Sequence, residues 1–69
     1  MNRYTKKLDE LRLHLYETQL QAEYFLRFSS PKNPEIHELI TPDVTSIIYE
    51  AKHQQQILTE LIDKINLIK

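Results

Sequence analysis

Apolar residues recur along the first part of the chain at alternating spacings of three and four residues. The segment from residue 2 to residue 28 contains no Pro and no Gly and consists largely of good helix formers. Alternating three- and four-residue spacing places side chains on one side of an α-helix, as in a coiled-coil seam. The pattern predicts a helix over about residues 2–28, with a seam made of Tyr4, Leu8, Leu11, Leu15, Thr18, Ala22 and Phe25.

The same spacing runs through the last part of the chain. Thr41, Pro42 and Asp43 have the properties of a helix start: a capping residue, a Pro at the first helical position and an acid near the positive end of the helix dipole. The pattern predicts a second long helix over about residues 42–67. Its expected seam consists of Val44, Ile47, Ala51, Gln54, Leu58, Leu61, Ile65 and Ile68.

Residues 29–41 interrupt the pattern and are expected to connect the two helices. Pro31 disfavours the helical conformation at the residue before it, so the first helix should end there. Asn33 can cap a new turn that begins with Pro34. We therefore expect a Pro-containing connector with one or two turns of helix over residues 34–40.

Two long helices and one connector predict an all-α fold, an antiparallel two-helix hairpin of coiled-coil type that forms a single domain over residues 1–69. The preferred register pairs Thr18 with Gln54, because the two polar seam residues then share one layer. A polar layer fixes register at some cost in stability. The same register pairs Leu11 with Leu61, Phe25 with Ile47 and Tyr4 with Ile68.

The first helix carries a second apolar stripe, which we call the outer stripe, on nearly the opposite side from its seam. It consists of Leu13, Tyr16, Leu20, Tyr24 and Phe28. One helix cannot bury two opposed stripes against a single neighbour. Aromatic side chains are frequent at binding hot spots, so the outer stripe is predicted to bind another protein. The alternative is local coverage, in which Ile36, Leu39 and Ile40 cover the Tyr24–Phe28 end but cannot reach Leu13.

The composition of the chain argues against several classes of function. The chain has 69 residues, no Gly, no Cys, and nine basic against ten acidic residues. Without Gly, phosphate-binding loops and nucleophile elbows are excluded. The balanced charge argues against nucleic-acid binding, and no apolar run is long enough for membrane insertion, so a cytoplasmic location is expected. The core of so short a chain supplies roughly 3–5 kcal/mol, and a second polypeptide is the expected source of further stability.

Catalytic chemistry is not predicted. His37-Glu38 begins like the His-Glu-X-X-His zinc motif, but Thr41 stands where the second His is needed. The Ser residues lack an evident base or oxyanion donor. We expect no enzyme activity, no catalytic residue, no cofactor and no metal site.

In length and layout the whole chain resembles the small co-chaperones of type III secretion needle subunits. The most similar stretches are Leu8-Asp9-Glu10-Leu11 and Glu50-Ala51-Lys52-His53-Gln54. The resemblance implies a cytoplasmic, non-enzymatic helical hairpin that binds a tetratricopeptide-like chaperone and, with it, keeps a needle subunit soluble before export.

Two classes of function remain open at this point. The first is a small chaperone or co-chaperone that docks the outer stripe onto a larger helical partner. The second is a homodimeric four-helix-bundle regulator that buries the same stripe at a twofold axis, or a small inhibitor protein of phage or plasmid type.

Overall fold

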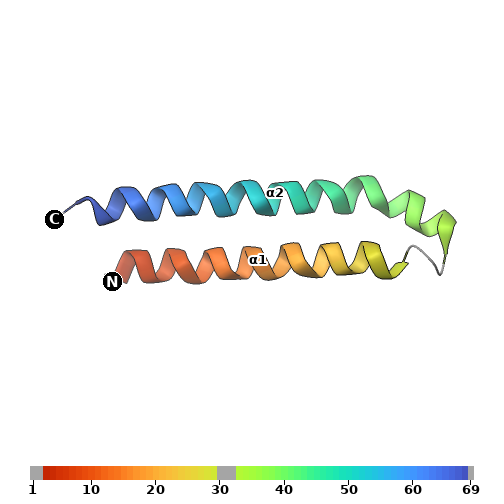
Figure 1. Cartoon of the computed structure of the whole chain (residues 1–69), viewed down its shortest axis with the longest axis horizontal. Coiled ribbons are helices and arrows are strands. Elements are labelled where there is room, and N and C mark those ends of the chain that lie inside the picture. The colour runs from red at the N-terminus through yellow and green to blue at the C-terminus, as the bar shows by residue number, and fades with distance from the viewer. Residues whose placement is uncertain (1–2, 30–32, 69) are drawn as a thin grey trace.

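The structure, a computed structural model, describes residues 3–29 and 33–68. Its two helices, α1 (Arg3–Ser29) and α2 (Pro34–Asn66), lie side by side and run antiparallel (Figure 1). They pack against each other along their length, which confirms the predicted all-α helical hairpin. The molecule measures 54 × 15 × 10 Å. It is therefore a single layer of two helices, and each helix has only one neighbour.

The turn between the helices is held by short-range hydrogen bonds. As predicted, Asn33 caps α2: its side-chain oxygen accepts from the Ile36 backbone N–H at 3.2 Å, and Pro34 follows at the first helical position. The Asn33 N–H donates to the Ser29 carbonyl at 3.3 Å. The Ser29 hydroxyl also lies 3.1 Å from His37 Nδ1, which links the end of α1 to the first turns of α2.

The predicted break at Thr41 and Pro42 is absent, because α2 continues through both residues. The segment 34–40 is helical but is not a separate short helix, so the connector is shorter than the expected residues 29–41. Thr41 does not cap a helix; its hydroxyl donates to the His37 carbonyl one turn earlier. Pro42 lacks the N–H that would bond the Glu38 carbonyl. Figure 1 shows the first turns of α2 tilted toward the end of α1, as expected before a Pro in a helix.

Few apolar side chains are fully buried between the helices. Among the described residues, those that are buried all come from α2: Ile48, Ala51, Leu58 and Ile62. From α1, Thr5 is buried, and Leu8, Leu15, Ala22 and Leu26 are half-buried. A core of this size stabilises the hairpin only modestly.

The helix contact is rotated relative to the predicted seam. The seam of each helix has two rows of side chains, with seven residues between successive members of a row. One row of each helix faces the other helix as expected: Leu8 and Leu15 in α1, and Leu58 and Ile65 in α2, are buried or half-buried. The other expected row lies at an exposed edge of the contact. The central part of this row consists of Leu11, Thr18 and Phe25 from α1 and Ile47, Gln54 and Leu61 from α2; Gln54 is half-buried and the others are exposed. Tyr4 and Ile68, expected to pair at the end of the same row, are 71% and 75% exposed.

The displaced row is exposed because the apolar stripe on α2 is wider than one neighbouring helix can cover. Ile47 and Ile48 are adjacent, as are Leu61 and Ile62. One neighbouring helix covers a narrow strip, so only one member of each pair can face it. The structure buries Ile48 and Ile62 and leaves Ile47 and Leu61 on the same exposed side of the hairpin.

Candidate protein interaction surface

The outer stripe lies on the part of α1 that α2 does not cover. Its five side chains are 44% to 64% exposed, although all are large and apolar or aromatic. They come from one rigid helix, so their relative positions are fixed before any partner binds. Such pre-organisation lowers the entropy cost of binding.

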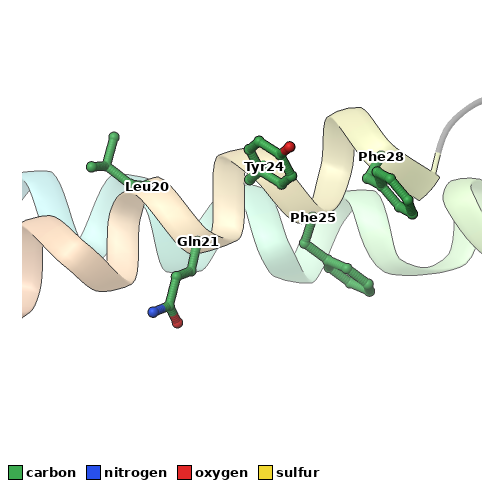
Figure 2. Close-up of a pocket in the computed structure, with 5 residues that line it drawn as sticks. All are labelled: Leu20, Gln21, Tyr24, Phe25 and Phe28. Carbon is green, nitrogen blue, oxygen red and sulfur yellow. The ribbon is translucent and has the colours of Figure 1, made fainter.

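At the end of the outer stripe nearest the turn, the side chains enclose a shallow hollow of about 490 Å³. It is lined by Leu20, Gln21, Tyr24, Phe25 and Phe28, all from α1, with α2 behind them in the view of Figure 2. The rings of Tyr24 and Phe28 stack with their centroids 6.5 Å apart and an angle of 15° between planes. The hollow is almost wholly apolar, so an apolar side chain of a partner would fit it.

Local coverage, the alternative interpretation of the outer stripe, is not what the structure shows. Tyr24 and Phe28 remain 64% and 54% exposed. The residues expected to cover them lie in the first turns of α2, where Ile36 is exposed, Leu39 is 76% exposed and Ile40 is half-buried. None of these three side chains lines the hollow beside the two rings.

The two edges of the helix contact differ in chemistry. One edge is polar: Arg12 Nη1 donates to Thr59 Oγ1 at 3.0 Å, and Gln55 Nε2 donates to Gln19 Oε1 at 2.8 Å. Arg12 also pairs with Asp9 within α1. These hydrogen bonds between helices set Arg12 level with Thr59 and Gln19 level with Gln55. The heptad pattern could not predict these bonds, because Arg12 and Gln19 lie outside the apolar seam.

The opposite edge is apolar and is called here the open face. It is the central part of the displaced row described above: Leu11, Thr18, Phe25, Ile47, Gln54 and Leu61. Its four apolar members are 40% to 51% exposed. Thr18 and Gln54 line one shared groove, which Leu15 also lines; Thr18 donates to the His14 carbonyl, and Gln54 donates to Glu50.

The hydrogen bond between Gln19 and Gln55 should contribute to the stability of the hairpin. We expect Gln19→Leu or Gln55→Leu alone to lower the free energy of unfolding by about 1 kcal/mol, because each change removes the bond between the helices. The remaining amide keeps only its bond within its own helix, from Gln19 to Glu23 or from Gln55 to the Ala51 carbonyl. Gln19→Leu with Gln55→Leu should be neutral or stabilising. Urea unfolding of the four proteins in a double-mutant cycle measures the coupling. If the losses in the two single variants add up to the loss in the double variant, the hydrogen bond between Gln19 and Gln55 does not contribute to stability.

Other kinds of site find little support among the described residues. No three of their His, Asp or Glu side chains are grouped so that they could hold a metal ion. Within residues 3–29 and 33–68, neither helix is long and apolar enough to cross a membrane.

Comparison with known proteins adds no relative. The chain matches no protein family, no curated protein and no solved structure at a significant level of similarity.

Proposed function

We propose that the chain is a non-enzymatic protein-binding module that docks the outer stripe onto a larger helical partner, as a cytoplasmic co-chaperone does. The observation that carries this proposal is the exposure of five large side chains on one side of α1, 44% to 64% each. Contiguous apolar surface that rests uncovered mostly marks a binding site. A chaperone of tetratricopeptide type, such as type III secretion co-chaperones bind, presents a helical surface suited to this stripe.

Site-specific photo-crosslinking in the native host tests which surface meets the partner. A photoreactive amino acid is introduced at Tyr16 or Leu20 in the outer stripe, and at Lys52 or His53 on α2 as matched controls. We expect a defined heteromeric crosslink from the first two positions only. Mass spectrometry of the crosslinked band identifies the partner. Equal crosslinking from all four positions would count against the proposal.

Substitution in the outer stripe should abolish the complex without unfolding the hairpin. Leu20→Asp puts a charge into a contact that must lose water, at a cost of several kcal/mol. We expect at least a 100-fold rise in the Kd for the recombinant partner identified by crosslinking, while helicity by circular dichroism is retained. His53→Asp, at an exposed position of α2 away from the outer stripe, is the control and should change the Kd little. A complex that survives Leu20→Asp would refute docking through this stripe.

A further inference from the structure

We propose that the open face binds the open face of a second copy of this chain, giving an antiparallel four-helix bundle that leaves Leu13, Tyr16 and Leu20 uncovered. This inference does not depend on the proposed function, because it rests on the displaced row beside the helix contact. The two surfaces meet only near the turn, where Phe25 of the open face also lines the hollow at the end of the outer stripe. Self-association through the open face leaves Leu13, Tyr16 and Leu20 for another protein.

The open face forms a largely apolar groove along the line where the two helices meet, with Thr18, Glu50 and Gln54 as its polar wall residues. Two neighbouring grooves of about 230 and 160 Å³ lie along it and share Leu15 and Gln54 in their walls. The buried residues Leu58 and Ala51 each line one of these grooves. The open face is therefore a partly opened core, and a second layer of helices would close it.

The surface area of the isolated hairpin exceeds that of a compact protein. Its accessible surface is 5743 Å², whereas a compact monomer of 8.3 kDa has about 4,600 Å². The difference, roughly 1,100 Å², exceeds the ~800 Å² per partner that a standard stable interface buries. A dimer contact of standard size would therefore remove most of this excess.

The order of polar and apolar layers makes the open face complementary to itself. The polar members of the row, Thr18 and Gln54, stand at its middle, and Glu50, which lines the same groove, accepts a hydrogen bond from Gln54 at 2.9 Å. Leu11 and Phe25 lie seven residues, about two helical turns, on either side of Thr18, and Leu61 and Ile47 lie as far on either side of Gln54. A twofold rotation about the middle layer therefore sets polar against polar and apolar against apolar, as an interface between identical surfaces requires.

Charges beside the open face favour this antiparallel arrangement. In it α2 packs on α2 of the copy, with Gln54 opposite Gln54. Asp43 lies eleven residues before Gln54 and Lys64 ten residues after it, so each Asp43 comes level with the copy's Lys64. In the reverse orientation α2 would face α1 of the copy, and each Asp43 would lie about 31 Å along the bundle from the copy's Lys64, because 21 residues of helix separate the two positions. Opposed charges select the first orientation over the second.

Sedimentation equilibrium of the full chain, with one matched pair of variants, tests which face self-associates. We expect the wild-type chain to be a dimer, Leu61→Asp to raise the dimer Kd about 100-fold or more, and Leu20→Asp to leave it dimeric. The two Leu side chains are similarly exposed, 40% and 44%, so the control matches the test in chemistry and in accessibility. A monomeric wild-type chain, or a dimer dissociated by Leu20→Asp and not by Leu61→Asp, would overturn the proposal.

Because the chain contains no Cys, engineered thiols report the orientation even if a charged variant fails to fold. Thr18→Cys and Gln54→Cys should each form a disulfide-linked dimer on mild oxidation, since each residue meets itself across the twofold axis. Leu20→Cys should remain unlinked under the same conditions. Failure of both single variants to crosslink, or a dimer linked only when both thiols are present, would refute the antiparallel arrangement.

Discussion

Replacing Leu58 with Ala is expected to unfold most of the protein at 25 °C. Leu58 is one of the four buried apolar side chains among the described residues, and it also lines a groove of the open face. Leu-to-Ala changes in a core cost about 2–5 kcal/mol, through lost burial and the cavity that remains. The core of a chain of this length supplies roughly the same amount in total. Circular dichroism at 222 nm during urea titration measures the loss.

The matched control for Leu58→Ala is Leu39→Ala in the same helix. Leu39 is 76% exposed, so its truncation should change the free energy of unfolding by no more than about 0.5 kcal/mol. Both variants are compared with the wild type at one protein concentration, because association would stabilise the folded chain by mass action. Similar losses for the two variants would show that the core does not lie at Leu58.

Replacing Pro42 with Ala is expected to stabilise the protein strongly. Pro42 lies inside α2, where it removes one backbone hydrogen bond and its ring crowds the preceding turn. A Pro in a helix interior is about 3 kcal/mol less favourable than Ala. For a domain of this size that difference corresponds to a rise in Tm of roughly 12–24 °C. Thermal unfolding followed by circular dichroism checks the shift.

Pro34→Ala is the control for Pro42→Ala. Pro34 occupies the first helical position, where a backbone N–H has no partner within the helix and the fixed φ of Pro suits the conformation. We expect a change in Tm of a few degrees at most. An unchanged Tm in Pro42→Ala would mean that contacts at the turn, such as Ser29 with His37, require the bend that Pro42 imposes.

The sequence predicted both helices correctly but placed the start of the second helix at the wrong Pro. The helix-start signal at Asn33 and Pro34 is confirmed, whereas the similar signal at Thr41 and Pro42 is wrong. The local difference is the side chain's partner: Asn33 accepts from the N–H of Ile36 ahead of it, and Thr41 donates to the carbonyl of His37 behind it. Two helical turns that already pack beside the end of α1 can continue through a Pro at the expense of one hydrogen bond.

The sequence by itself determined that this protein is a hairpin of two helices with an excess of apolar surface, because heptad spacing and capping residues act locally. Only the tertiary structure decided which part of each wide stripe is buried. A single neighbouring helix covers too narrow a strip for both Ile47 and Ile48 to face it, and the bonds of Arg12 and Gln19 to α2 hold the helices with Ile48 inside. The outer stripe followed from spacing along one helix, whereas the open face depends on how two helices are rotated against each other.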